Sequence, residues 1–290
     1  MSDSGGWGVD SEHGRLLDVL VCRPDNFHWL ETSAISKATL ESGLEFDPGR
    51  ARAQHDQMIS AYETAGVRCH FLDPDPQLPY QVFARDSSTM TPWGAVITRL
   101  RQDWRRGEDG PARRFHEAAG PPIAGEISAG SLEGGDVVIV GPGHALIGCS
   151  GFRTEEPAAE QLAELFRAEG WEARVEGFPE DYVHIDVLVS VLAEGLAAVC
   201  TEVASPSLVD WLRGLGFELI DVSAEDAFTL GVNAISLGSA RVLSAAAAKP
   251  LNEAMRAHGL EILEPELDMF TLGGGGAHCL ALALRREAAE

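Results

Sequence analysis

The chain has 290 residues, of which 45% are apolar and 23% are charged. That length and composition are typical of a folded, soluble protein with a sizeable hydrophobic core. Acidic residues outnumber basic ones by 45 to 22, and the formal net charge of −23 repels nucleic-acid phosphates and anionic lipids. We therefore expect neither a nucleic-acid partner nor a membrane partner.

The N-terminal segment and the most apolar run both favour a cytoplasmic location. Residues Met1 to Gly6 lack the basic and apolar stretches of a signal peptide, and the most apolar run, Val187 to Cys200, is interrupted by Glu194. The five cysteines are far apart and form no Cys-x-x-Cys pair, so neither a disulfide framework nor a zinc ribbon is indicated. The oligomeric state is left open, and a homo-oligomer is compatible with the sequence.

Five glycines divide the chain into units of similar length. Each follows a helical pattern, and most precede a short extended run, as expected of a left-handed helix cap that leads into a strand. They are spaced 43 to 54 residues apart, at Gly66, Gly120, Gly170, Gly216 and Gly259. A period of about 50 residues is typical of propellers and repeat arrays, whose units cannot bury their own apolar faces. We therefore expect one domain over residues 1–290.

Within a unit the pattern is strand, strand, helix, strand. In the third unit we expect strands over 136–140 and 144–148 and a helix over 155–169. The fourth unit repeats the order, with strands expected over 184–191, 196–200 and 217–222 and a helix over 208–215 that Ser205-Pro206 introduces. The fold class is therefore α/β, and the alternative to a five-unit propeller is an ordinary doubly wound sheet.

Two acidic motifs lie beside expected strands. Phe83-Ala84-Arg85-Asp86 places an Arg and an Asp at the start of a strand, where a surface ion pair is the simpler interpretation. Glu133 and Asp136 flank a glycine pair, at which another part of the molecule can approach the backbone closely. For Asp136 we favour a turn in which the carboxylate bonds its own backbone, but for Glu133 we do not.

A third motif, His184-Ile185-Asp186, lies in a very apolar segment. If that segment is a strand, both polar side chains point to one face, where burial is costly unless they are paired or functional. A structurally satisfied core histidine and a catalytic one are equally compatible with this segment alone.

The last motif is Gly273-Gly274-Gly275-Gly276-Ala277-His278-Cys279. A phosphate cradle is one explanation for the glycines, but no Lys-Ser/Thr helix start follows. The other is backbone kept open around a reactive Cys279, with amides that could stabilise a thiolate or an anionic transition state. The remaining cysteines lie in apolar contexts and are interpreted as inert packing residues: Cys22, Cys69, Cys149 and Cys200.

Together these motifs, with Ser150-Gly151-Phe152-Arg153-Thr154, resemble in order and spacing the guanidine-modifying enzymes of the pentein superfamily. That superfamily includes arginine deiminases, dimethylarginine dimethylaminohydrolases and amidinotransferases. The similarity runs from Tyr80 to Leu284 and implies a five-bladed, pseudo-symmetric ββαβ propeller, which agrees with the period of the glycines.

The resemblance also implies roles for single residues. Cys279 would be the nucleophile, His184 the general acid and base, and Glu133 the carboxylate beside His184. Asp86 and Asp186 would hold the guanidinium nitrogens of the substrate.

Two arginines are implied as ligands of a substrate α-carboxylate, namely Arg153 and Arg105, with Arg106 as the alternative to Arg105. The chemistry needs no cofactor and no metal, because a thiolate attacks the guanidinium carbon and gives a covalent thiouronium that water hydrolyses. A metal hydrolase built on His184, Glu133, Asp186 and His278 is a further alternative, but the spacing lacks a ligand motif.

The expected substrate is a small guanidine, arginine or an Nω-methylated arginine, with citrulline and ammonia or a methylamine as products. Asp186 favours an unsubstituted guanidinium, because enzymes that act on dimethylarginine carry Lys there, whereas the chain length resembles those enzymes. Two alternatives stay open. The Gly-Gly-Ala-His-Cys ending is close to that of amidinotransferases, which pass the amidino group to an amine, and a catalytically silent guanidine-binding module would carry the same fold.

Overall fold

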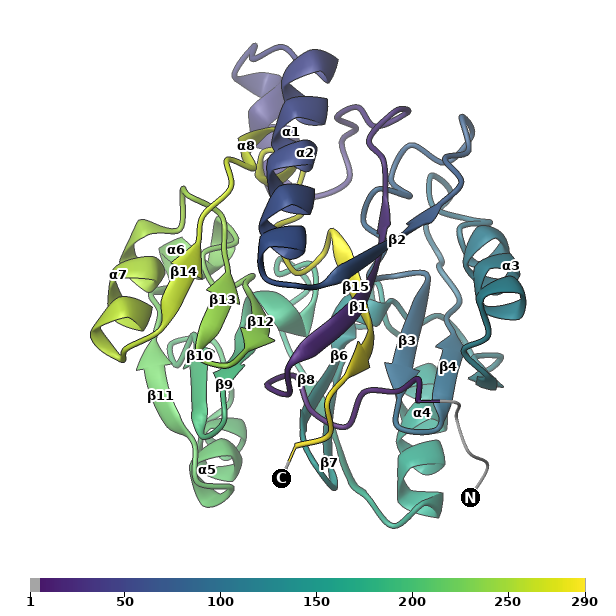
Figure 1. Cartoon of the computed structure of the whole chain (residues 1–290), viewed down its shortest axis with the longest axis vertical. Helices are drawn as coiled ribbons and strands as arrows, with labels where there is room; N and C mark the ends of the chain where they lie inside the picture. Colours follow the sequence, from purple (N-terminus) through teal and green to yellow (C-terminus); the bar gives the residue numbers. More distant parts are fainter. Residues whose placement is uncertain (1–5, 290) are drawn as a thin grey trace.

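Figure 1 shows the computed structural model of the chain, which describes residues 6–289. Strands form five small sheets toward the centre, and helices lie at the periphery (Figure 1). Apart from Gly6, the segment Met1 to Gly6 from which we inferred the absence of a signal peptide falls outside the described residues. Within 6–289, no helix combines the length and the apolar character needed to cross a membrane.

Each sheet has three strands, and its middle strand pairs antiparallel with one neighbour and parallel with the other. The first sheet is β15 (Ala281–Arg286), β1 (Leu16–Cys22) and β2 (Arg68–Leu72). The next two are β3 (Ser88–Thr91), β4 (Gly94–Ile97) and β5 (Ile123–Glu126), then β6 (Val137–Gly141), β7 (His144–Cys149) and β8 (Glu172–Gly177). The last two are β9 (Val189–Ala193), β10 (Leu196–Val199) and β11 (Glu218–Asp221), then β12 (Ile235–Gly238), β13 (Arg241–Leu243) and β14 (Glu261–Leu263).

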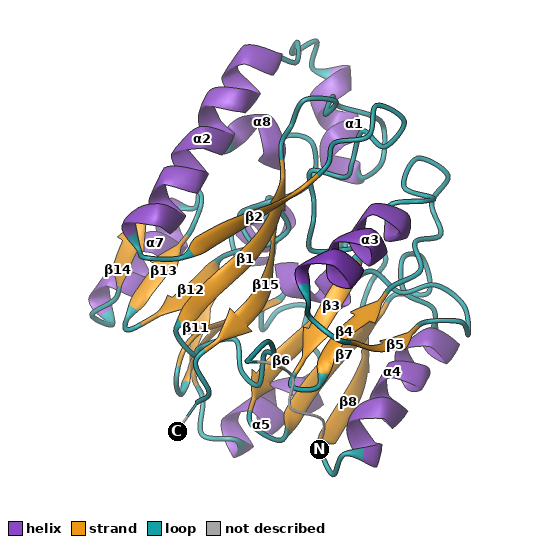
Figure 2. Cartoon of the chain, turned by 45° about the vertical axis from the view of Figure 1, so that its right-hand side comes forward, coloured by secondary structure: helices purple, strands orange, loops and turns teal. Residues whose placement is uncertain are grey.

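One helix connects the middle strand of each sheet to its parallel neighbour. These helices are α2 (Pro48–Thr64), α3 (Asp109–Ala119), α4 (Glu156–Ala168), α5 (Pro206–Gly214) and α7 (Lys249–Ala257), and Figure 2 shows them on the outside of the sheets. Just after each helix stands one of the five spaced glycines, with φ between 80° and 97°. A left-handed conformation costs glycine little, so the predicted helix caps are confirmed. The remaining short helices are α1 (Ala34–Glu41), α6 (Ala224–Phe228) and α8 (Asp268–Thr271).

The five-unit ββαβ propeller is confirmed. Its sheets are separate, so the doubly wound alternative is wrong. The ring is closed by the two ends of the chain, because β15 pairs antiparallel with β1. Side chains that are fully buried between helices and sheets, such as Tyr62, Phe166 and Phe270, fill the space behind the strands.

Two expected strand starts are wrong. The segment 184–191 begins with a 3-10 turn, η2 (Ile185–Val187), and its strand starts only at Val189. A second 3-10 turn, η1 (Gly134–Asp136), replaces the expected start of β6. The cause is a long-range hydrogen bond, because the Ile185 amide donates to Asp136 Oδ1 at 2.8 Å and joins the two turns to each other instead of to a strand partner.

Candidate active site

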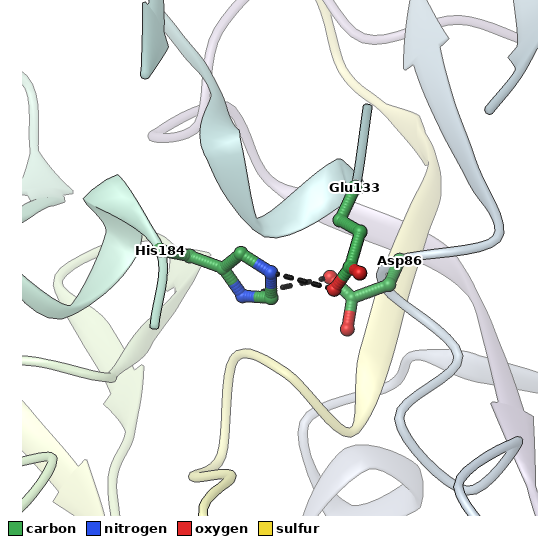
Figure 3. Close-up of side chains that lie close together, drawn as sticks. All are labelled: Asp86, Glu133 and His184. Atoms are coloured by element: carbon green, nitrogen blue, oxygen red, sulfur yellow. Dashed lines mark hydrogen bonds and ion pairs between the residues drawn. The ribbon is translucent and has the colours of Figure 1, made fainter. Parts of the chain in front are cut away.

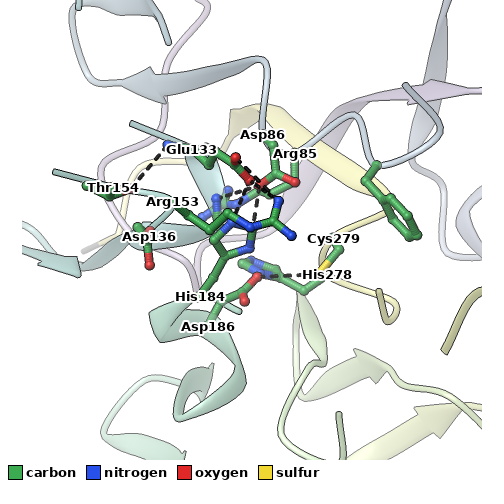
Figure 4. Close-up of polar contacts among 12 residues, drawn as sticks. Arg85, Asp86, Glu133, Asp136, Arg153, Thr154, His184, Asp186, His278 and Cys279 are labelled. Carbon is green, nitrogen blue, oxygen red and sulfur yellow. Dashed lines mark hydrogen bonds and ion pairs between the residues drawn. The ribbon is translucent and has the colours of Figure 1, made fainter. Parts of the chain in front are cut away.

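The five units contribute to the site at equivalent places. In each unit the contributing residue lies just before the first strand: Asp86 before β3, Glu133 before β6, His184 before β9, Asn233 before β12 and Cys279 before β15. These first strands contact one another around the centre of the ring. The fold therefore brings residues that are up to 193 positions apart into one cluster, which Figure 4 shows.

Cys279 is a buried, unoxidised thiol at this centre. Its Sγ lies 3.8 Å from Asp186 Oδ2. Burial, followed by the charge of Asp186, raises the pKa of Cys279 to about 11, although the positive charge of His184 acts in the other direction. The thiol is therefore protonated at neutral pH in the absence of a bound cation. Burial also raises the pKa of Cys22 and Cys69, in both cases to about 12.

His184 is held by two carboxylates, as Figure 3 shows. Its Nε2 lies 2.9 Å from Glu133 Oε2, and its Nδ1 lies 3.8 Å from Asp86 Oδ1. Burial alone would lower the pKa of His184, but Asp86 and Glu133 outweigh it, and the net shift is well upward. The resting imidazole is therefore protonated and can serve as an acid.

Glu133 is fully buried and surrounded by cations. Arg153 Nη1 lies 3.2 Å from its Oε2, and Arg105 Nη1 lies 3.3 Å from the same oxygen. Burial would raise the pKa of Glu133, but Arg153, His184 and Arg105 together hold it well below its usual range. Glu133 is therefore ionised and can keep the His184 ring oriented and charged.

Arg105, and not Arg106, reaches the cluster. The Arg105 guanidinium is buried and lies 2.6 Å from Asp86 and 2.7 Å from Glu108. The Arg106 side chain, by contrast, is 71% exposed and pairs with Asp103. Arg106, the alternative to Arg105, therefore lies outside this cluster. In this structure Arg105 occupies a position against Asp86, where we expected a substrate guanidinium to bind.

Two interpretations of the acidic motifs change. Arg85 and Asp86 are both buried and pair with Glu12 and Arg105, respectively, so the expected surface ion pair is wrong. Asp136 does lie in a turn, η1, but its carboxylate accepts from the Ile185 amide of another unit, so the expected bond to its own backbone is wrong. Burial raises the pKa of Asp136 to about 7.

The glycine pair allows the close approach that we expected. A Cβ at Gly134 would lie 2.0 Å from the Arg85 carbonyl oxygen, and one at Gly135 would lie 2.4 Å from His184 Nδ1. The Gly135 amide also donates to Asp86 Oδ1 at 2.9 Å. Because Gly135 has no side chain, the side chains of His184 and Asp86 can both lie against its backbone.

The four glycines before Cys279 meet one expectation in part. The amides of Gly273, Gly274 and Gly275 donate to carbonyl oxygens of α8, so they do not cradle a phosphate or face an anion. Gly274 and Gly275 do line a small cavity that Cys279 also lines. The loop also packs closely, since a Cβ at Gly275 would lie 2.1 Å from the Phe83 ring and one at Gly276 would lie 2.6 Å from Asn233 Oδ1. The glycines therefore allow the thiol to be carried close to the centre.

Asp86, Glu133 and His184 could in principle hold a metal ion, since one ligand atom of each lies within 4.8 Å of the others. The same two carboxylates already bind Arg105 and Arg153. A divalent cation would have to displace both guanidinium groups, so this donor set fits a metal poorly. Of the residues in the alternative metal site, Asp186 and His278 lie outside this group.

A small cavity of about 20 Å³ opens beside the thiol. It is lined by Asp86, Arg105, Arg153, His184 and Cys279, among others. A larger cavity of about 300 Å³ shares Thr32, Ser33, Arg153 and Val183 with it and carries the exposed acids Glu31, Glu180 and Asp181. The two cavities therefore lie next to each other, and Lys37, which pairs with Glu31, also lines the larger one.

The sequence reasoning missed two residues of this cluster, Asn233 and Glu12. Asn233 Oδ1 accepts hydrogen bonds from the amides of His278, at 3.0 Å, and Cys279, at 3.3 Å. Glu12 forms a buried contact with His278, which we had considered only as a ligand in the alternative metal site. Neither Asn233 nor Glu12 belongs to a local motif, and only the closure of the ring brings them to the centre.

The comparisons with known proteins agree with this geometry. The family model described as N,N dimethylarginine dimethylhydrolase, eukaryotic, matches residues 23–286. The chain belongs to this family. Over 242 residues it is 28% identical to the N(G),N(G)-dimethylarginine dimethylaminohydrolase of Pseudomonas aeruginosa strain PAO1, covering 81% of this chain and 89% of that protein.

Two solved structures share the fold with this member of the dimethylarginine dimethylhydrolase family. A mutant of the Pseudomonas aeruginosa enzyme complexed with citrulline has a TM-score of 0.79 at 24% identity and covers 92% of this chain and 99% of its own. The N-terminal domain of ArgZ, an arginine dihydrolase of cyanobacteria, has a TM-score of 0.81 at 18% identity. The match covers 93% of this chain and 98% of the ArgZ domain. The recognised superfamily and fold are confirmed, and the family places the chain among hydrolases of amidine C–N bonds.

Proposed function

We propose that this protein hydrolyses the guanidino group of arginine, or of a lightly substituted arginine, through a covalent intermediate on Cys279. The observation that carries the proposal is that a buried thiol, a protonated imidazole and the Asp86 carboxylate line one cavity, while a second carboxylate, Asp186, lies beside the thiol. A guanidinium is a poor electrophile, so it has to be held by carboxylates and attacked by a strong nucleophile. These residue types supply both requirements.

Substrate binding exchanges ion pairs. The substrate guanidinium takes the place of Arg105 against Asp86, and Arg105 and Arg153 turn to the substrate α-carboxylate. The larger cavity beside Arg153 holds the amino-acid end, with its α-ammonium toward the acids at the rim. The number of charges buried without a partner does not increase, which keeps the cost of desolvation low.

The chemistry then follows from the protonation states. The bound cation lowers the pKa of Cys279, and the thiol releases its proton to solvent. The thiolate then forms a bond to the guanidinium carbon, and a tetrahedral adduct results. His184 donates its proton to the departing nitrogen as the C–N bond breaks, and ammonia or an amine leaves. Neutral His184 next accepts a proton from water, the oxygen bonds to the thiouronium carbon, and loss of the sulfur gives a ureido product and free thiolate.

Asp186 favours an unsubstituted nitrogen. Its Oδ2 is bound by His278, whereas its Oδ1 has no partner among the described residues and is free to accept an N–H. A methyl group there would leave this buried oxygen unsatisfied. Relatives and neighbours act, by name, on dimethylarginine or on arginine, and one is complexed with citrulline.

A substrate panel tests the proposal. Purified protein should form citrulline from arginine, more slowly from monomethylarginine and more slowly still from asymmetric dimethylarginine. Cys279→Ser should abolish citrulline formation, and Cys69→Ser, which changes a half-buried thiol of β2, should leave it intact. Activity of Cys279→Ser equal to that of the wild type would remove the proposal.

The same assay tests whether water or an amine attacks the covalent intermediate. The His278-Cys279 pair resembles that of amidinotransferases, so glycine or lysine is added together with arginine. We expect citrulline formation to be unchanged by either amine. A new guanidino product at the expense of citrulline would assign amidinotransfer instead.

The role of Arg105 has its own test. Arg105→Lys should raise KM for arginine by about 100-fold, because the planar pair of donors for the α-carboxylate is lost. Agmatine, which lacks that carboxylate, is the matched substrate, and its KM should change by less than about threefold. An equal loss for both substrates would show that Arg105 does not bind the carboxylate.

A further inference from the structure

A line of buried charges leads from Arg85 to the thiol. Arg85 Nη2 lies 2.9 Å from Glu12 Oε1, Glu12 Oε2 lies 3.1 Å from His278 Nε2, and His278 Nδ1 lies 2.8 Å from Asp186 Oδ2. All four side chains are more than nine-tenths buried. The line ends at Cys279, whose Sγ is 3.8 Å from the same Asp186 oxygen (Figure 4).

The geometry limits where protons can lie in this line. Both ring nitrogens of His278 face carboxylate oxygens at hydrogen-bonding distance, and an ionised carboxylate can only accept. A neutral imidazole has one N–H, so one of the two carboxyl groups would then have to carry a proton. For Glu12, Arg85 is bound to the carboxylate and Arg286 lies nearby, and both favour its ionised form. A proton on Asp186 Oδ2 with a neutral His278 ring is the arrangement that the nitrogen-15 spectra below distinguish from an imidazolium.

We propose that His278 is a positioning residue, held as an imidazolium between Glu12 and Asp186, that fixes Asp186 beside Cys279 and offsets its charge. By binding Oδ2 of Asp186, His278 leaves Oδ1 as the acceptor for a substrate nitrogen. Its positive charge reduces the repulsion between Asp186 and a forming thiolate. The effect on catalysis rests on the proposed role of Cys279, but the state of the His278 ring does not.

The charged and titratable groups that face His278 are contributed by every element packed against it. They are Glu12 from the segment before β1, Arg85 before β3, Asp186 in η2, Cys279 beside it and Arg286 in β15. Burial and Arg85 lower the pKa of His278, and Glu12 and Asp186 outweigh them, so the net shift is upward. His55 and His116 are the opposite case, since burial lowers their pKa to about 4.

Nitrogen-15 spectra of the histidine rings test the protonation state without any turnover. At pH 7 to 8 the His278 signal, assigned by its absence in His278→Asn, should show two protonated nitrogens, and those of His55 and His116 should show neutral rings. In Glu12→Gln the His278 ring should become neutral over this pH range. A neutral His278 in the wild-type protein would overturn the proposal, even if the enzyme hydrolyses arginine.

Alkylation of Cys279 tests the link to the thiol. At pH 8.5, iodoacetamide should modify Cys279 about tenfold more slowly in His278→Asn than in the wild type, because the Asp186 and Glu12 charges are no longer offset. Asp18→Asn is the matched control, since Asp18 is a fully buried carboxylate that lies 2.8 Å from His70 in β2, and it should leave the rate unchanged. An unchanged rate in His278→Asn would contradict the proposal, and inactivity of the wild type toward every guanidine would contradict only the proposed function.

Discussion

At the scale of single residues, the resting site is set for acid catalysis and not for immediate attack. His184 carries a proton because Asp86 and Glu133 outweigh its burial, and Cys279 keeps its proton because burial and Asp186 raise its pKa to about 11. A thiol in this state is protected from oxidation and stray electrophiles. The cationic substrate is therefore the natural trigger of its ionisation.

The pH dependence of Cys279 alkylation checks this order of events. Because the thiol pKa is raised, the thiolate fraction falls as pH decreases, and the rate should rise about tenfold per pH unit between pH 7 and 10. A bound, unreactive guanidine that leaves the sulfur accessible should shift this profile to lower pH. A rate that is independent of pH, with and without the guanidine, would contradict this account.

Gly135 offers a test of how closely the catalytic groups have to approach. A Cβ at this position would lie 2.4 Å from His184 Nδ1, so Gly135→Ala should displace the ring and lower kcat/KM by about 100-fold. Gly177→Ala is the control, because a Cβ there would meet its nearest neighbour only at 3.9 Å. Near-normal activity in Gly135→Ala would show that the position of His184 tolerates movement.

At the scale of elements, the decisive structures are the turns that precede the first strand of each unit. The sequence predicted Glu133, His184 and Cys279 as a group because they lie in recognisable motifs. It did not predict the 3-10 turn over Ile185–Val187, since alternating polar and apolar residues are typical of a strand. The Asp136 bond to Ile185 overrides that preference, and such a contact between distant units leaves no local signal.

Asn233 shows what one such turn contributes. Its side-chain oxygen accepts from the amides of both His278 and Cys279, so Asn233→Ala should free the nucleophile loop and lower kcat by about 10- to 100-fold. Loss of a buried acceptor should also cost about 1–3 kcal/mol of unfolding free energy.

Asn252→Ala separates these two effects. Asn252 is fully buried in α7 and donates to Ala245 and Glu264, so its loss should cost similar stability. Its activity below the melting temperature should stay at the wild-type level. If the two variants lose activity equally, Asn233 matters only for stability.

At the scale of the whole molecule, the five repeated units could be predicted from the sequence. The isolated residues that meet at the centre when the ring closes could not. Left-handed glycines after five helices gave the number and the order of the units, because a helix cap is a local feature. Glu12 comes from a segment with no motif, before β1, and it reaches the centre only because β15 and β1 pair to close the ring. Sequence patterns predict such units, but not which isolated residue their assembly buries.

The charge of the whole chain gives a prediction of its own. With a net charge of −23 and three exposed acids at the mouth of the larger cavity, association of a cationic substrate should be favoured at low ionic strength. Raising NaCl from about 20 to 500 mM should lower kcat/KM for arginine by a few-fold and leave kcat unchanged. A fall in kcat alone would show that salt acts on the chemistry instead.

The central claim is that Cys279 bonds covalently to the substrate carbon. Rapid acid quenching during arginine turnover, followed by mass spectrometry of the digested protein, tests it most directly. We expect the peptide that contains Cys279, and no other cysteine peptide, to gain the mass of arginine less one ammonia, because the thiouronium retains the rest of the substrate. Citrulline formation at full rate, with every cysteine peptide unmodified at all quench times, would contradict the account.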